Sequence, residues 1–144
     1  MVSSKNKVKG FTLVELLIVI VVIAILAAIS IVAYNGVTQK ARDDERVATA
    51  RNLINAAAAY NSEHDKWPEH SELMTFQTVK LTGAAADNTK VKADADPNAK
   101  HDTYKYTVCK DASSNATGVQ VQYYREVASG SETAGVKTLT SGKC

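Results

Sequence analysis

The chain has 144 residues with 17 basic and 15 acidic side chains, so its formal net charge is only +2. This nearly neutral balance argues against the broad basic face of a nucleic-acid-binding protein. The two cysteines, Cys109 and Cys144, lie far apart and form no C-x-x-C pair, which argues against a zinc site or a thioredoxin-type dithiol. An exported chain with two distant cysteines most simply holds one disulfide.

An apolar stretch near the N-terminus dominates the sequence. From Leu16 to Ala33 every side chain except Ser30 is apolar, and a helix of this length measures roughly 27 Å, close to the hydrocarbon thickness of a bilayer. We therefore expect residues 11–34 to form a membrane-inserting helix. Glu15 lies inside the apolar segment, where inserting a charged side chain costs on the order of 3 kcal/mol. Such a carboxylate requires either the membrane interface or a partner.

The residues ahead of this helix are basic. Lys5, Lys7 and Lys9 are the only charged residues there, and the positive-inside rule keeps them in the cytoplasm and directs the rest of the chain outward. Gly10 lies between the basic segment and the helix, where a peptidase has access to the bond that follows. Removal of residues 1–10 leaves 14 basic and 15 acidic residues, a net charge of −1.

The segment from Lys9 to Glu15, KGFTLVE, resembles the leader junction of type IV prepilins and pseudopilins. The resemblance implies that a prepilin peptidase removes residues 1–10 by cutting between Gly10 and Phe11, and then N-methylates Phe11. It also implies that Glu15 pairs with the Phe11 amine of a neighbouring subunit. Such pairing neutralises the buried carboxylate only on assembly.

Two alternative interpretations of this segment stay open. A cleaved secretory signal has an apolar region of about 7 to 15 residues that ends at an A-x-A-like site, which Ala28-Ile29-Ser30 matches poorly. A plain single-pass anchor would need neither Glu15 nor the Gly10-Phe11 junction.

Residues 35–66 are expected to continue the helix, because they are rich in good helix formers. Asn35-Gly36 is the expected weak point, since Gly destabilises a helix interior by up to about 1 kcal/mol. Apolar residues at spacings of three, four and seven predict one stripe that packs under a globular head. They are Val37, Ala41, Val47, Ala50, Ile54, Ala57 and Ala58.

Charged residues from Arg42 to Arg51 occupy the other faces of this helix. Arg42 and Glu45 stand three apart, as do Asp43 and Arg46, which is close enough to interact along the helix. Two interpretations apply to this cluster: a solvated face, or pairing between subunits along a fibre.

Trp67-Pro68 ends the helix, because the residue before Pro avoids α geometry. An aromatic-Pro pair soon after the long helix also resembles pilins and pseudopilins. We expect Trp67 to cover the hydrophobic core of a globular head formed by residues 67–144. Within the head, residues 71–74 are expected to begin a short helix, 78–82 to be extended, and 83–102 to form a polar surface loop.

Three strand-like segments complete the head. Residues 104–109 and 119–127 alternate apolar and polar side chains, residues 136–140 do so more weakly, and 111–118 and 128–135 are loop-like. An antiparallel meander is the natural arrangement. The expected fold class is therefore α+β: a long N-terminal membrane-inserting helix packed through its C-terminal half against a small antiparallel sheet, the pilin fold that the resemblance implies.

The predicted disulfide requires Cys144 to approach Cys109 across the end of the sheet. With the strands in chain order the outer two lie about 9.6 Å apart, too far for Cys109 and Cys144 to bridge directly. Residues 141–143 are therefore expected to fold back across the end of the sheet. Closing the loop is worth about 3 to 4 kcal/mol in the chain-entropy model.

No arrangement typical of a catalytic site is present in the sequence, and neither an enzymatic activity nor a cofactor is expected. The three histidines lack helical metal-ligand spacing. Residues 94–98 imitate the start of a calcium loop, but Ala99 and Lys105 stand where the turn glycine and the bidentate glutamate belong. Calcium is therefore the less favoured interpretation. Asn115-Ala116-Thr117 fits a glycosylation sequon, which is weak evidence alone.

The resemblance implies a structural subunit that polymerises into a type IV pilus and supports surface attachment, with twitching motility or DNA uptake as further roles. Implied partners are other copies of the chain, the prepilin peptidase, the pilus assembly platform and ATPase, and the membrane before assembly. The precursor is expected in the inner membrane with its head outside, and the product on the cell surface. The alternatives are a pseudopilin of a secretion-like or competence apparatus and a membrane-anchored adhesin domain that does not polymerise.

Overall fold

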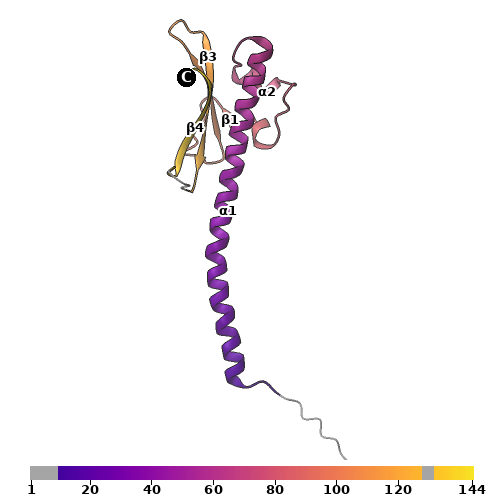
Figure 1. Cartoon of the computed structure of the whole chain (residues 1–144), viewed down its shortest axis with the longest axis vertical. Helices are drawn as coiled ribbons and strands as arrows, with labels where there is room; N and C mark the ends of the chain where they lie inside the picture. Colours follow the sequence, from indigo (N-terminus) through magenta and orange to yellow (C-terminus); the bar gives the residue numbers. More distant parts are fainter. Residues whose placement is uncertain (1–9, 128–131) are drawn as a thin grey trace, which may run out of the picture. The chain divides into compact units, whose positions relative to one another are not determined.

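The computed structural model describes residues 10–127 and 132–144. Within them lie α1 (Leu13–His64), α2 (His70–Thr75), the 3-10 helix η1 (Gly83–Ala86), β1 (Val91–Lys92), β2 (Tyr104–Lys110), β3 (Ala116–Arg125) and β4 (Gly135–Gly142) (Figure 1). The chain divides into two units, residues 1–38 and 39–144, and α1 contributes to both. The predicted leader lies outside the described residues except for Gly10, as does part of the predicted connection 128–135.

The first unit contains the N-terminal part of α1. Helical structure begins at Leu13 and continues through Asn35 and Gly36 without a break. The large apolar side chains here are exposed in the single chain, between 46% at Val21 and 78% at Leu13. By length and composition α1 can cross a membrane, and none of its most apolar 18-residue window is buried.

In the second unit, α1 buries one stripe of side chains. The predicted stripe was wrong at its N-terminal end, because Val37 and Ala41 are exposed while Asp43 and Arg46 are buried. An apolar pattern treats charged residues as exposed, so it misses charges that are buried in pairs. The buried residues of α1 are Asp43, Arg46, Thr49, Ala50, Leu53, Ala56, Ala57 and Tyr60.

The strands of the described residues form one sheet in the order β1-β2-β3-β4. β2, β3 and β4 are antiparallel neighbours, so the predicted meander is confirmed, with β3 and β4 differing in extent from 119–127 and 136–140. β1 was not predicted: it pairs in parallel with β2, with Val91 opposite Tyr104. The sheet is therefore mixed rather than purely antiparallel.

The segment between α1 and β2 holds the remaining differences. The short helix expected at 71–74 is present as α2, whereas residues 78–82 form no strand and the expected loop 83–102 contains η1 and β1. β1 is held by partners distant in sequence; the Tyr104 N–H, for example, donates a 2.8 Å bond to the Lys90 carbonyl. Local sequence patterns do not reveal such partners.

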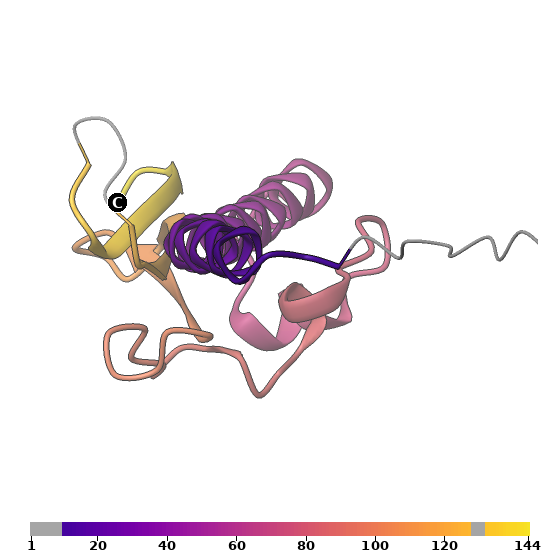
Figure 2. The ribbon, with the colours of Figure 1, turned by 90° about the horizontal axis from the view of Figure 1, so that it is seen from below.

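The hydrophobic core of the second unit lies between its sheet and its part of α1. Tyr106 of β2 and Val119 and Val121 of β3 belong to one buried cluster with Leu53 and Ala57 of α1. Full burial of a leucine side chain is worth about 2 kcal/mol, and alanine allows the strands to approach the helix closely. Figures 1 and 2 show the sheet on one side of this part of α1 and α2 on the other. The α+β fold class is confirmed.

α1 ends close to the predicted position. Asp65, with φ of 52°, has the left-handed conformation that often follows a helix. The fully buried Pro68 accepts a 2.7 Å hydrogen bond at its carbonyl from the Tyr106 hydroxyl. Trp67 is half-buried and packs against the core, as expected.

A disulfide joins Cys109 and Cys144, whose Cα atoms lie 5.1 Å apart. β4 continues to Gly142, so the crossing over β3 is shorter than the expected 141–143. At the crossing, the Lys143 N–H donates to the Thr117 carbonyl at 2.9 Å, and the Thr117 hydroxyl donates to the Lys143 carbonyl at 2.7 Å.

Two glycines make room for this crossing. Gly118 pairs with Cys109 on one side and with Gly142 on the other. A Cβ on Gly118 would lie 2.6 Å from the Ser141 carbonyl oxygen, and a Cβ on Gly142 would lie 2.5 Å from the Thr117 carbonyl oxygen. Gly142 also has a φ of +82°, which side chains rarely adopt. Any other residue at these positions must displace backbone.

Candidate processing and assembly site

The bond between Gly10 and Phe11 lies in non-helical chain ahead of α1. Phe11 is 90% exposed. Among the described residues, a Cβ built on Gly10 would meet no atom within 4 Å. Packing within the chain therefore does not explain why a glycine stands at this position.

Thr12 and Glu15 cap the start of α1 reciprocally. The Thr12 N–H donates a 2.8 Å bond to Oε2 of Glu15, and the Glu15 N–H donates a 3.2 Å bond to the Thr12 hydroxyl. This is a capping box, in which two backbone donors left free at a helix start receive partners. The T-x-x-E spacing is its sequence signal, and our sequence analysis did not use it.

The cap lowers the free-energy cost of placing the Glu15 carboxylate in the apolar segment. In the single chain its carboxylate already accepts a backbone N–H and lies at a helix N-terminus, where negative charge is favoured. Within the described residues no Lys or Arg side chain pairs with it. The predicted partner, the Phe11 amine, would exist only after cleavage, so that pairing stays a prediction.

The rest of the apolar segment leaves no side-chain polar group unsatisfied. Ser30, its only polar residue between Leu16 and Ala33, donates a 2.8 Å bond from its hydroxyl to the Leu26 carbonyl. A helix with all its polar groups bonded internally is compatible with lipid and with a dry interface between helices. Glu15 is then the one charged group on this part of the surface.

A second charged cluster links α1 to the end of β3. Arg42 donates two hydrogen bonds to the Glu126 carboxylate, at 3.2 and 2.7 Å. Arg46 donates to Glu126 at 2.7 Å and to Asp43 at 2.9 Å. The bonds from Arg42 and Arg46 lower the pKa of Glu126 to about 2.

Asp43 also bonds the backbone beyond β3. Its carboxylate accepts the N–H groups of Glu126 and Val127, each at 2.9 Å. Asp43 and Arg46 are only 3% and 8% exposed, so both interpretations of the charged cluster, a solvated face and pairing between subunits, are wrong for these two residues. Helical spacing predicted their mutual contact but could not reveal Glu126, which is 83 residues beyond Asp43.

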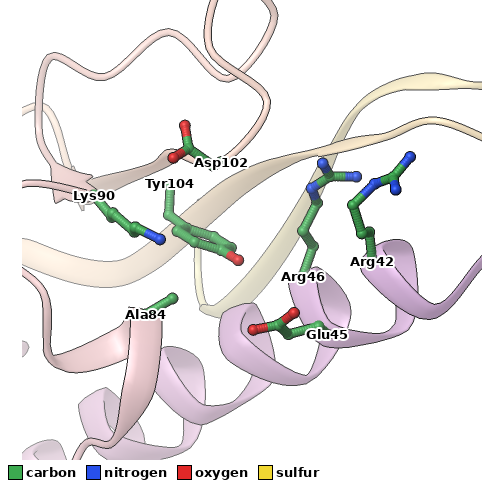
Figure 3. Close-up of a pocket in the computed structure, with 7 residues that line it drawn as sticks. All are labelled: Arg42, Glu45, Arg46, Ala84, Lys90, Asp102 and Tyr104. Carbon is green, nitrogen blue, oxygen red and sulfur yellow. The ribbon is translucent and has the colours of Figure 1, made fainter. Parts of the chain in front are cut away.

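A pocket of about 110 Å³ adjoins this cluster (Figure 3). The pocket has three cationic side chains, but Glu45 and Asp102 line it as well. Asp43 and Glu126 bind the arginines. Acidic groups therefore outnumber basic ones, and the pocket is not an anion site. The lining residues are Arg42, Glu45, Arg46, Ala84, Lys90, Asp102 and Tyr104.

The other candidate residues make local contacts. Oδ1 of Asp96, in the calcium-like segment, accepts the N–H groups of Asn98 and Ala99 at 3.0 and 3.3 Å. Asn115 is exposed in the turn between β2 and β3. In the part of the chain that the structure describes, no group of three or more His, Cys, Asp or Glu side chains is placed to hold a metal ion.

Comparisons with known proteins cover part of the chain. Residues 5–31 match a family model described as the prokaryotic N-terminal methylation motif. A type IV major pilin protein PilE1 of Neisseria gonorrhoeae is 43% identical over 63 residues, or 44% of this chain and 38% of that protein. A fimbrial protein of Neisseria meningitidis serogroup A is 40% identical over 63 residues (44% and 37%). The fimbrial protein EcpC of Eikenella corrodens is 41% identical over 64 residues (44% and 42%). No solved structure matches.

The exposed junction and the start of the apolar helix lie within the motif at residues 5–31, so this segment has the features of an N-terminal methylation motif. Over about 63 residues, 44% of its length, the chain is similar to type IV major pilins and fimbrial proteins, as the resemblance implied. The match spans only about 38% of the length of the gonococcal relative. What the complete relatives do is therefore not transferred to this chain by the match alone.

Proposed function

We propose that the protein is a structural subunit of a type IV pilus, a helical homopolymer held together by its N-terminal helices. The observation that carries the proposal is the methylation motif at residues 5–31, which includes the start of an apolar helix whose side chains are uncovered in the single chain. Packing such helices against one another removes their apolar surface from water once they leave the membrane. The names of the relatives, type IV major pilin and fimbrial protein, support the same function.

Maturation begins with a prepilin peptidase that hydrolyses the bond between Gly10 and Phe11, after which the new amine is N-methylated. The exposure of Phe11 supports access to this bond. Gly10 has no packing role among the described residues, which is consistent with a glycine kept for recognition by an enzyme.

Assembly pairs the Glu15 carboxylate of one subunit with the Phe11 ammonium of a neighbour. Before assembly, the capping bond with the Thr12 N–H lowers the cost of keeping the carboxylate at the membrane. In the fibre, a helix docked in the wrong axial register leaves both charges buried and unpaired, which disfavours that register.

The precursor resides in the inner membrane with its N-terminus in the cytoplasm and residues 39–144 outside, in keeping with the lysines before Gly10. An assembly platform and its ATPase then move the subunits into a surface fibre that supports attachment, with twitching motility or DNA uptake as further roles.

The test is the N-terminus of the protein in filaments sheared from cells, measured by mass spectrometry. We expect filaments made mainly of this chain, beginning at N-methylated Phe11. A chain that retains Met1, or that starts near Ile31 as a secretory signal would require, contradicts the proposal. Gly10→Val should block cleavage, and a mature Phe11 terminus in that variant would refute the junction.

The two alternatives differ in the same experiment. A pseudopilin would be cleaved at Phe11 but yield only short fibres at low abundance. An adhesin domain on a membrane anchor would yield no filaments, and its amount on the cell surface would not depend on Glu15.

A further inference from the structure

A hollow of about 360 Å³ lies at the C-terminal end of α1. The last turns of α1 line one side, and α2 with the segment after it lines the other. It combines aromatic rings with acidic side chains. The residues that matter here are Tyr60, Glu63, His64, Glu72, Phe76 and Thr78.

The aromatic rings form a corner. His64 stacks on Tyr60 with ring centroids 4.1 Å apart and planes 16° from parallel. Phe76 stands nearly perpendicular to both, 5.2 Å from Tyr60 and 6.2 Å from His64. Faces of such rings carry partial negative charge and attract cations within about 6 Å of the centroid.

Negative charge is in excess at the hollow. Its two carboxylates are Glu63 and Glu72, and the cation nearby is Lys66, which leaves one negative charge in excess. Lys66 is bound to Glu72, whereas Glu63 accepts a hydrogen bond from the Thr78 hydroxyl, at 3.1 Å. Within residues 10–127 and 132–144, no Lys or Arg side chain pairs with Glu63.

Lys66 contacts two residues that line the hollow, Glu72 and Tyr60. Its ammonium donates a hydrogen bond to Glu72 and at the same time lies 5.9 Å from the centroid of the Tyr60 ring. Its side chain is 54% exposed and is not one of the residues that line the hollow. One ammonium beside the hollow thus combines a carboxylate and an aromatic ring, and the hollow itself is lined by a second carboxylate, Glu63, and a further ring, Phe76.

We propose that this hollow is a binding site for a primary alkylammonium group, the chemistry of a lysine side chain. The Glu63 carboxylate accepts its N–H donors, while the rings of Phe76 and His64 contact its methylene stem. A primary ammonium is favoured over a quaternary one because Glu63 and Glu72 offer hydrogen-bond acceptors, which a methylated nitrogen cannot use. The site does not depend on polymerisation, so it goes beyond the function proposed above.

The probe is N-acetyl-lysine methylamide, titrated into the full chain in detergent micelles and followed by the amide NMR shifts of residues 60–78. Glu63→Gln should weaken binding about two- to fivefold, the range expected for one exposed charge contact. Lys66→Met frees Glu72 and should strengthen binding by a similar factor. Glu45→Gln, which changes an exposed glutamate of α1 outside the hollow, is the matched control and should leave binding unchanged.

Two further probes make the test specific. The norleucine analogue lacks the ammonium and should not bind, and the trimethyl-lysine analogue should bind more weakly than lysine. Equal binding of the lysine and norleucine probes, tighter binding of the trimethyl form, or no effect of Glu63→Gln in a chain with an unchanged spectrum would overturn the proposal.

The molecule that supplies the natural lysine is identified by measuring how the apparent affinity for the probe depends on protein concentration. If a second copy of the chain supplies it, the apparent affinity for the probe falls as the protein concentration rises. If another molecule supplies it, the affinity stays constant. Both results keep the assignment of the ligand and differ only in its origin.

Discussion

The two units of the chain differ in whether their apolar side chains are buried and in how far along the sequence their polar groups find hydrogen-bond partners. In residues 10–38 the apolar side chains are exposed and the polar groups bond to near neighbours, as Thr12 does with Glu15. In residues 39–144 the apolar side chains are buried and polar groups bond across the fold, as Arg42 does with Glu126. Substitutions in the first unit should therefore change association, and substitutions in the second should change folding stability.

The largest effect is expected from Glu15→Gln. Glutamine retains the capping box but not the charge, so α1 and membrane insertion should persist while the neighbouring Phe11 ammonium loses its partner. Leaving a buried charge unpaired costs about 3 kcal/mol or more, and filament yield should fall at least about a hundredfold in sheared fractions. Thr12→Ala is the matched control, because it removes the hydroxyl of the cap and keeps the charge. Normal piliation by Glu15→Gln would refute the pairing.

Leu53→Ala and Ile25→Ala compare the same kind of truncation in the two units. Leu53 is fully buried, and its loss should lower the free energy of unfolding of the head by about 2 to 5 kcal/mol. Ile25 is 56% exposed in the single chain and should leave that value unchanged in micelles. Chemical denaturation followed by near-UV circular dichroism measures both. Equal destabilisation by the two variants would contradict the division described here.

Gly118→Ala and Gly36→Ala form a second pair. The new Cβ at residue 118 meets the backbone of Ser141 and Lys143, so we expect a loss of about 1 to 3 kcal/mol and slower formation of the disulfide. At residue 36 nothing lies within 4 Å among the described residues, and alanine should favour the helix by up to about 1 kcal/mol. Thermal unfolding and thiol titration during refolding test the pair. A stable, rapidly oxidised Gly118→Ala variant would show that the crossing does not need glycine.

The smallest expected effect is on the loss of folding stability at low pH. The pKa of Glu126 is about 2 in the folded chain, below its ordinary value of 4.5, because Arg42 and Arg46 bond its carboxylate. The unfolded chain therefore binds the proton more readily, and the stabilisation, complete above about pH 5, decreases as the pH falls from there toward 2. Urea unfolding between pH 6 and pH 3 should show a smaller loss for Glu126→Gln, which starts less stable at pH 6. Identical pH profiles of the two proteins would contradict the role of this network.

Sequence patterns predicted the elements whose causes are local. The apolar run, the KGFTLVE junction and the alternation in β2 and β3 each depend on neighbouring residues, and the disulfide followed from having two cysteines. β1 and the buried Asp43 depend on partners far along the chain, at Tyr104 and Glu126, and an apolar pattern assigns charged residues to the surface. The capping box has a local sequence signal, the T-x-x-E spacing of Thr12 and Glu15, and could have been predicted. It was missed because Glu15 was viewed only as a membrane charge.

The disulfide has a mechanical consequence. Cys109 and Cys144 are 35 positions apart, and the covalent ring that they close contains β3 and β4. A load that unfolds the head cannot extend the chain inside this ring, which withholds roughly 120 Å of contour length at about 3.4 Å per residue. Stretching the oxidised head with an optical trap should therefore release only the chain outside the ring, and a reductant should add the missing length.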